Sequence, residues 1–353
     1  MIHRDRRAII LWLSLCLLLV AAMVLVGGYT RLSGSGLSIT QWKPVHGVLP
    51  PLDEMQWQEE FSAYRATPQY ALVNKGMSLA EFKTIFWPEF FHRLLARTVG
   101  IVFFIPLLVF AMRRAISKRF FWRLAGIFAL GGLQGAVGWV MVASGLVDTP
   151  YVSPVKLAMH LGLAFAIFGL IEWQLLVALS SPSPLAGEGR DGEELSAGLS
   201  TLREPPLPTF PLKGGRLYRV WFSALACQII LGALLAGLHG GLVYNTWPDM
   251  NGQFAPSGLF SDNITLIQFA HRTLAIFVAC GFLFWWYSQR EYVKNRHLGR
   301  VCSGVTLVLF MQFSLGVLTL VNAATLPLAL THQITALLLW ASAVLLMYKL
   351  KNT

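Results

Sequence analysis

The stretch EFFHRLLART, residues 89–98, is matched later in the chain by QFAHRTLAI, residues 268–276. Each stretch places a histidine-arginine pair near the start of a long apolar run. Ionisable residues inside such runs are costly and are by default functional. Because the pair occurs twice, we expect the chain to contain an internal repeat with one polar site in each copy.

The apolar residues indicate a membrane protein. They make up 55% of the 353 residues, whereas charged residues make up only 13%. They come in blocks of about 20 residues, the length that crosses the hydrocarbon core of a bilayer. The sequence therefore predicts an all-α integral membrane protein with eight transmembrane helices, of which the first is retained as an anchor. The predicted spans are residues 8–28, 90–112, 120–143, 154–179, 220–238, 264–287, 298–321 and 326–348.

Basic residues indicate the orientation of these spans. Lysines and arginines precede the first span, fill the turns after the second and sixth, follow the eighth and occur in the long fourth loop. All of these segments lie on one side of the membrane, and Lys and Arg accumulate on the cytoplasmic side. We predict a multi-pass protein of the bacterial inner membrane with both termini in the cytoplasm. The formal net charge of +11 follows from this topology, so membrane lipid is an expected partner and nucleic acid is not.

The chain divides into two similar halves. Residues 180–217 are rich in Pro, Gly and Ser, as flexible linkers are, and they separate a first half, residues 1–179, from a second, residues 218–353. Each half has an even number of spans, so the repeat is parallel. We expect two tandem four-helix bundles related by a pseudo-two-fold axis along the membrane normal. Aligning Trp42 with Trp247 without a gap pairs Gly36 with Gly241, Gly47 with Gly252 and Pro51 with Pro256, and QGAVG at 134–138 matches QFSLG at 312–316.

Four histidines lie near the outer starts of spans, two in each half. A single histidine at a helix end is usually an interfacial polar residue, but a facing pair in a helical bundle can hold haem. A zinc or copper site would need three or four converging ligands. The pattern therefore favours two bis-histidine haem centres near the outer face. The four candidate ligands are His92, His160, His271 and His332.

Three arginines near these histidines are candidate partners of the haem propionates: Arg93, Arg97 and Arg272. Arginine binds carboxylates through paired hydrogen bonds. The alternative is that the guanidinium groups extend to lipid headgroups, which applies more to Arg97 than to the repeated pair.

Glu89 distinguishes the first copy from the second. It precedes His92 by three residues, so the two side chains share one face of a helix, and the repeat has Gln268 in its place. A carboxylate after Pro88 also suits the start of a helix. Because two otherwise matching sites differ in a group that can transfer protons, we assign Glu89 as a catalytic residue and expect the second site to hold a resident cofactor.

The motifs GGYTRLSGSGLSITQWKPVHGVLPP, EFFHR, MHLG, FAHRT and LTHQ resemble those of haem A synthase, and the likeness covers nearly the whole chain except the linker. The likeness is to the alphaproteobacterial and mitochondrial branch of this family. Some bacterial members carry a cysteine pair in outer loops, and this pair does not occur in this sequence. The resemblance implies oxidation of the C8 methyl of haem O to the formyl group of haem A, through hydroxylated intermediates, for assembly of the terminal haem-copper oxidase. By the same likeness, His92 and His160 flank the substrate haem O. His271 and His332 hold a resident haem b that passes electrons.

Two other functions fit parts of the pattern. A di-haem b electron-transfer cytochrome would need two equivalent sites, and the Glu89 difference argues against it. A transporter with internal repeats fits less well, because the polar residues gather at the outer face and not at mid-membrane.

Further features stay open at this stage. The outer loop, residues 52–84, has no counterpart in the second half and is expected to cap the first site. The sequence leaves open the electron donor, direct docking of a haem O synthase, a homo-oligomeric state, and a proton-relay role of Glu172. It also leaves open whether a histidine leaves the iron or the porphyrin itself is oxidised.

Overall fold

The computed structural model describes residues 3–42, 46–180, 215–290 and 296–352. Eight helices in these ranges are long and apolar enough to cross a membrane, which confirms the predicted all-α, multi-pass membrane fold. Most of the predicted linker, residues 180–217, lies outside the described residues. The long helices are α1 (His3–Leu32), α4 (Leu79–Met112), α5 (Lys118–Ala143), α6 (Pro154–Ser180), α8 (Gly215–Gly237), α9 (Asn263–Ser288), α10 (Arg296–Val321) and α11 (Leu326–Lys351).

The helix α4 begins well before its predicted start at residue 90. Ser78 and Glu81 form a capping box, in which the Glu81 carboxylate accepts from the Ser78 backbone N–H at 2.7 Å and the Ser78 hydroxyl accepts from the Glu81 N–H. The helix then continues through Pro88, although proline removes one internal hydrogen bond. The interpretation of Glu89 as a residue at a helix start is therefore wrong, since Glu89 is buried well inside α4.

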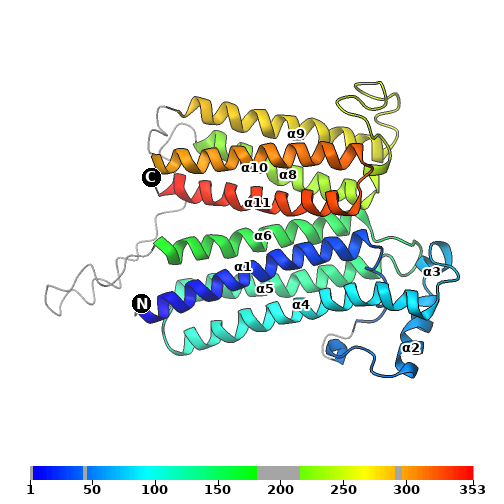
Figure 1. Ribbon diagram of the computed structural model, residues 1–353. Helices are drawn as coiled ribbons and strands as arrows, with labels where there is room; N and C mark the ends of the chain where they lie inside the picture. The colour runs from blue at the N-terminus through cyan, green and yellow to red at the C-terminus, as the bar shows by residue number, and fades with distance from the viewer. Residues whose placement is uncertain (1–2, 43–45, 181–214, 291–295, 353) are drawn as a thin grey trace.

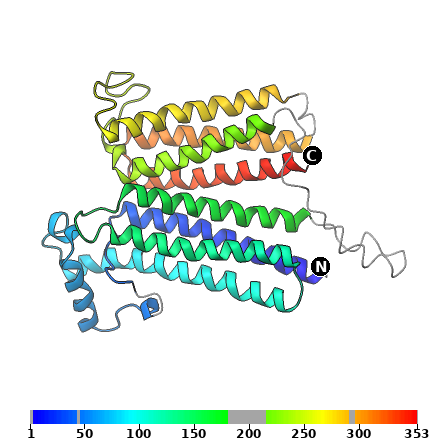
Figure 2. The same ribbon diagram turned by 180° about the vertical axis from the view of Figure 1, so that it is seen from behind.

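The eight long helices lie side by side with their axes along a common direction (Figure 1). In the first half, α1 contacts α4 and α6, and α5 contacts the same two helices, so α4 and α6 lie at opposite corners of a bundle. The second half repeats this order, with α8 and α10 each contacting α9 and α11. The halves meet through contacts of α6 with α8 and α11, and of α1 with α11. Figure 2 shows the same two stacked groups from behind.

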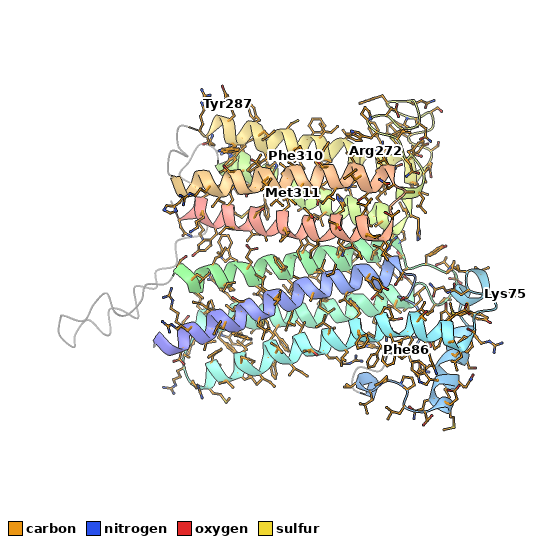
Figure 3. All side chains as sticks on the ribbon, viewed as in Figure 1. Lys75, Phe86, Arg272, Tyr287, Phe310 and Met311 are labelled. Carbon is orange, nitrogen blue, oxygen red and sulfur yellow. The ribbon has the colours of Figure 1, made fainter. Side chains whose placement is uncertain are left out.

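The two ends of the bundle differ. The start of α1 and the end of α11 lie at one end (Figure 1). The opposite end, here called the outer end, carries η1 (His46–Val48), α2 (Glu54–Arg65), α3 (Pro68–Leu72) and η3 (Gly240–Leu242). Figure 3 shows Arg272 toward the outer end of α9 and Tyr287 toward the other. An alternating path through eight spans produces this arrangement.

The outer segment between α1 and α4 has a small aromatic core of its own. α2 begins at Asp53, whose carboxylate accepts from the Gln56 N–H at 2.8 Å. Buried rings of α2 then pack on α4, with the Trp57 and Phe86 ring centroids 4.9 Å apart. Because buried aromatic pairs dominate the energetics of small cores, this cluster fixes α2 over the outer part of α4. Its buried members are Trp57, Phe61, Tyr64, Phe82, Phe86 and Phe90.

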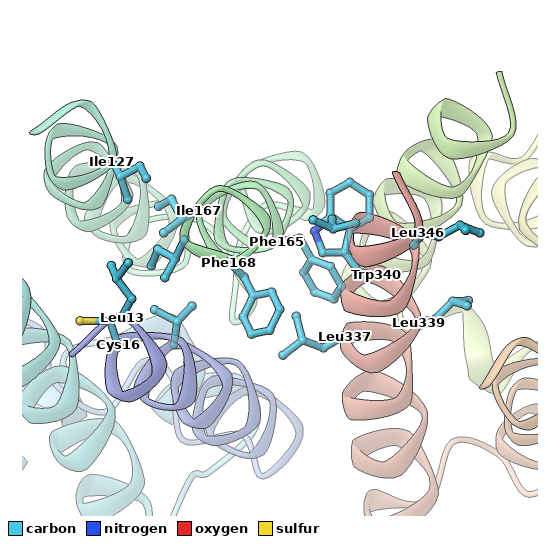
Figure 4. Packing of buried hydrophobic residues seen from close by; sticks show 14 of the residues in the cluster. Leu13, Cys16, Ile127, Phe165, Ile167, Phe168, Leu337, Leu339, Trp340 and Leu346 are labelled. Atoms are coloured by element: carbon cyan, nitrogen blue, oxygen red, sulfur yellow. The ribbon is translucent and has the colours of Figure 1, made fainter. Parts of the chain in front are cut away.

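Close packing holds the two halves together. Apolar burial gives little driving force between helices in lipid, so association depends on packing and on small residues that let helices approach. Figure 4 shows Phe165 and Phe168 of α6 facing Trp340 and Leu337 of α11. Glycines lie at four of these contacts: Gly28 against Gln333, Gly162 against Ile230, Gly169 against Trp340, and Gly237 against Pro154.

We expect Gly237→Ala to weaken the contact between the halves. A Cβ at this position would lie 2.7 Å from the Pro154 Cα, a backbone atom that cannot rotate aside. Such overpacking typically costs about 1–3 kcal/mol. Thermal unfolding in detergent should show a lower midpoint for this variant. Gly131→Ala is the matched control, because nothing lies within 4 Å of its Cβ, and equal midpoints for the two variants would contradict the packing described.

Candidate functional site

Four histidine rings pack against four glycines of neighbouring helices. The glycines lie on α1, α5, α8 and α10, and the histidines on α4, α6, α9 and α11. An added Cβ would come so close to the ring that the ring or the helix would have to move, so only glycine permits this approach. The Cβ would lie between 2.8 and 3.0 Å from an atom of the facing ring in the pairs Gly27 with His92, Gly138 with His160, Gly232 with His271, and Gly316 with His332.

The histidines form one pair in each half. His92 on α4 and His160 on α6 come from opposite corners of the first bundle. His271 on α9 and His332 on α11 have the corresponding positions in the second bundle. No cluster of three or more His, Cys, Asp or Glu side chains that could hold a metal ion occurs among the described residues. Each bundle therefore suits a group that takes one imidazole from each side.

A glutamine accompanies three of the four histidines. Each stands four residues before the glycine that packs on the same ring, which gives the motif Gln-x-x-x-Gly. The amide nitrogen lies 3.3–3.4 Å from the ring Nε2 in the pairs Gln134 with His160, Gln228 with His271, and Gln312 with His332. Sequence reasoning missed Gln228, although QIILG at 228–232 has the same spacing as the two glutamine motifs that it matched.

Several buried polar atoms of these residues have no hydrogen-bond partner. Such atoms are rare in native proteins. Their recurrence at three related positions is what a site shaped around a bound group produces. The atoms are Nδ1 of His160, His271 and His332, and Oε1 of Gln134, Gln228 and Gln312.

Glu89 is held by the segment that follows α1. Its Oε2 accepts from the Ser38 hydroxyl at 2.8 Å and from the Ile39 N–H at 2.9 Å. Its Oε1 accepts from the Arg93 Nη2 at 2.6 Å and Nε at 3.1 Å. All four contacts suit a carboxylate, which only accepts hydrogen bonds. At the related position of the second half, Gln268 instead donates to the Tyr244 carbonyl at 3.2 Å.

Comparison with known proteins shows what this chain is similar to. The family model for cytochrome oxidase assembly proteins matches residues 10–344. A protein named "Heme A synthase" from Nitrosospira multiformis is 43% identical over 357 residues, which cover 98% of this chain and 94% of the relative. Proteins of the same name from Agrobacterium fabrum and Cereibacter sphaeroides are 42% and 41% identical, cover 96% and 95% of this chain, and are themselves covered to 88% and 86%. The chain belongs to the cytochrome oxidase assembly protein family.

The residues that match the cytochrome oxidase assembly family, 10–344, include both histidine pairs, their glycines and Glu89. Membership confirms the resemblance inferred from the motifs. Membership of the family does not by itself assign a role to each side chain. The contacts of each side chain limit what it can do.

Arg93 fastens the segment after α1 to α4. Besides its ion pair with Glu89, its Nη1 donates to the Gln41 carbonyl at 2.9 Å and its Nη2 to the Ile39 carbonyl at 2.7 Å. These contacts use most of the guanidinium donors. The predicted contact of Arg93 with a haem propionate stays a prediction, and the observed partners are a carboxylate and a loop.

Arg272 makes the same kind of contact in the second half. Its Nη1 donates to the carbonyls of Thr246 at 2.9 Å and Asp249 at 2.8 Å, and its Nη2 donates to that of Tyr244. The Thr246 hydroxyl, 2.6 Å from the Asp249 carboxylate, holds the pKa of that carboxyl below its ordinary value. In the alignment of Trp42 with Trp247, Tyr244 corresponds to Ile39 and Thr246 to Gln41, so both arginines fasten equivalent loops.

Arg97 lies one helical turn beyond Arg93 on α4. With Arg93 it lines a cavity of about 290 Å³ between α4 and the outer segment, whose walls include Phe86, Phe90 and Glu59. Gln56, Glu59 and Glu60 of the outer loop that was expected to cap the first site line this cavity. The roles predicted for Arg97 and for the cap stay predictions.

We expect Arg272→Leu to release the loop that follows α8. The substitution removes three hydrogen bonds from a charged donor, each typically worth about 1.5–3 kcal/mol. Hydrogen-deuterium exchange should accelerate at least tenfold in residues 243–253. Arg65→Leu is the control, because that guanidinium lies over the Phe61 and Tyr70 rings in the other half. Equal exchange of residues 243–253 in both variants would show that the clamp does not hold the loop.

Proposed function

We propose that this protein is a haem A synthase, an oxidoreductase that converts haem O to haem A during assembly of a haem-copper terminal oxidase. Its membership of the cytochrome oxidase assembly family and its 43% identity to a protein named "Heme A synthase" over 98% of the chain carry this proposal. The two histidine pairs give it a physical basis, because a helical bundle with facing imidazoles is suited to haem.

The residues present fit two haem groups. In the first half, residues 1–179, His92 and His160 would flank the substrate haem O. In the second half, residues 218–353, His271 and His332 would hold a resident haem b. The glycine beside each ring and the unpartnered ring Nδ1 atoms of three histidines support this reading. Arg93, Arg97 and Arg272 are the basic residues that we propose as partners of the propionates.

A bound haem b would supply one-electron redox chemistry to the substrate site. The protein's own contribution to the first site is Glu89. Its carboxylate is buried one helical turn from His92 and is fixed from two directions by Ser38 and Arg93. We assign to it proton transfer at the hydroxylated C8 substituent, where a geminal diol loses water to give the formyl group, the task of a positioned general acid-base group.

The second half lacks this carboxylate. Gln268 is an amide, which does not exchange protons in this way, and the position related to Ser38 is Val243, which has no hydroxyl. This difference supports a division of work in which the first half oxidises and the second half transfers electrons. A di-haem b electron-transfer cytochrome is the second candidate, because the glycines and arginine clamps are alike in both halves.

The distribution of basic residues also gives the proposed orientation of the protein in the membrane. The described chain ends lie opposite the outer end (Figure 1), so cytoplasmic termini would place both haem sites toward the periplasm in a bacterial inner membrane. Haem O, which carries an apolar tail, would come from the lipid. A haem O synthase and a separate electron donor are the partners that this reaction needs, and a homo-oligomer is compatible with it.

We expect Glu89→Gln, which gives the first half the amide of the second, to lower haem A formation about 100-fold or more. Haem extraction and chromatography of membranes with a haem O source should show haem O or a hydroxylated intermediate in place of haem A. The reciprocal substitution, Gln268→Glu, is the control. Combined with Glu89→Gln, it should not restore haem A formation. His271→Ala should lose both haem b and turnover. Only haem b in the wild type, despite available haem O, would favour the electron-transfer cytochrome.

We expect Gly138→Ala to reduce haem binding at the first site. Its Cβ would lie 2.8 Å from His160 Cε1, so the ring would have to leave its position. Displaced ligand geometry typically lowers affinity about 10–100-fold. Gly135→Ala on the same helix is the matched control, because nothing lies within 4 Å of its Cβ. Haem content per purified chain is the measurement, and equal loss in both variants would contradict the role of the contact.

A further inference from the structure

We propose that the cavity between α4 and the outer segment binds the headgroup of a phospholipid that carries both a phosphate and a primary amine. The lipid would come from the membrane leaflet at the outer end. The inference goes beyond the proposed function and does not rest on it. It rests on the charges that line the cavity and on the apolar surface around it.

The outer segment lies partly beside α4 and not only beyond its outer end. Leu49 and Pro50, which follow η1, line the cavity together with Arg93 and Arg97. Both arginines fall within the apolar span predicted for this helix, residues 90–112. Figures 1 and 2 show η1 on the side of α4 that faces away from the other long helices. The residues after η1 therefore lie at the depth of the membrane interface.

Large apolar side chains of this part of the outer segment are exposed. Leu49 is 69% exposed, Leu52 71% and Met55 68%. Apolar side chains grouped in this way would be unfavourable in water. They suit a membrane interface, where apolar groups insert below the lipid headgroups. The segment that forms one wall of the cavity is therefore placed to contact lipid.

The cavity is lined by charges of both signs, and these are separated along the membrane normal. Glu59 and Glu60 come from α2, which packs on the outer part of α4 at Phe86. Arg93 and Arg97 also line the cavity and lie further inward along α4. The acidic groups are therefore nearer the water, and the arginines are nearer the hydrocarbon.

This order of charges matches a phospholipid such as phosphatidylethanolamine. Its phosphate is next to the glycerol and the acyl chains, and its ammonium group lies beyond the phosphate. Arginine binds phosphate through paired hydrogen bonds, and carboxylates accept hydrogen bonds from an ammonium group. The volume of the cavity, about 290 Å³, is near the lower limit of ligand pockets, about 300–1,000 Å³. A lipid headgroup suits a cavity of this size.

The surface of α4 inward of the cavity suits the acyl chains of such a lipid. Ile101, Phe104 and Leu108 are exposed. They follow Arg97 at intervals of three or four residues, so they share one face of the helix with it. An acyl chain whose headgroup occupies the cavity can continue along this face. The bound lipid would hold the outer segment against α4 from the membrane side.

Lipid binding by the purified protein in detergent tests the proposal. Native mass spectrometry gives the relative affinities for phosphatidylethanolamine, phosphatidylglycerol and phosphatidylcholine with identical acyl chains. The second lipid lacks the amine, and the third has a quaternary amine without an N–H. We expect the wild type to bind phosphatidylethanolamine about tenfold more tightly than the other two, because only its ammonium group donates hydrogen bonds to the carboxylates.

Substitutions separate the two charged ends of the site. Glu59→Gln combined with Glu60→Gln should remove the preference for phosphatidylethanolamine. Glu54→Gln is the matched control on α2, because Glu54 pairs with Lys83 at 3.6 Å and is not among the residues that line the cavity. It should keep the wild-type preference. Arg97→Gln should weaken the binding of all three lipids, because each of them carries the phosphate.

The wild-type comparison involves no substitution, so it decides the question even if a variant does not fold. Equal binding of the three lipids, or a preference for phosphatidylglycerol, would overturn the inference. Equal preferences in the double variant and in Glu54→Gln would do the same. The measurement is independent of haem A formation, so either result leaves the proposed function as it stands.

Discussion

The approach of a histidine ring to bare glycine backbone is the contact on which the rest of this protein depends. In a bilayer, helices gain little by turning apolar side chains toward one another, because the lipid is equally apolar. Their association therefore depends on shape. A glycine on one helix makes room for an imidazole from the next, and this occurs four times. If the glycines carried side chains, the rings could not keep these positions without separating the helices.

The repeat supplies the same framework twice, and the proposed division of work between the halves rests on the departures from it. Both halves have the glycine contacts, the facing histidines and an arginine that fastens the loop after the first helix of the half. The first half alone has Glu89 and its partner Ser38, where the second has Gln268 and Val243. It also has Met23 where the second has Gln228. Each change alters hydrogen bonding more than shape, which is how two similar bundles can do different work.

The outer segment adds a further difference between the halves. Its aromatic core, centred on Trp57 and Phe86, stands on an extension of α4 that rises from the first site. Because α4 continues through Pro88, Phe86 of this core, Glu89 and His92 belong to one continuous helix. The outer aromatic core and Glu89 are therefore joined through a single helix, and the second half has no counterpart of this core in the described residues.

The sequence by itself determined the eight spans, the two-fold repetition of the histidines and the family, because span length, residue spacing and motifs are properties of the chain read in order. The Glu89 to Gln268 difference is of the same kind. Only the tertiary structure decided the early start of α4, the partners of Arg93 and Arg272, and the pairing of each histidine with a glycine and, in three cases, a glutamine. These contacts join residues far apart in the chain, and no local pattern specifies which side of a helix will meet which neighbour. The approach of Gly27 to the His92 ring is the clearest instance, since a glycine in a transmembrane helix has no meaning until the helix packed against it is known.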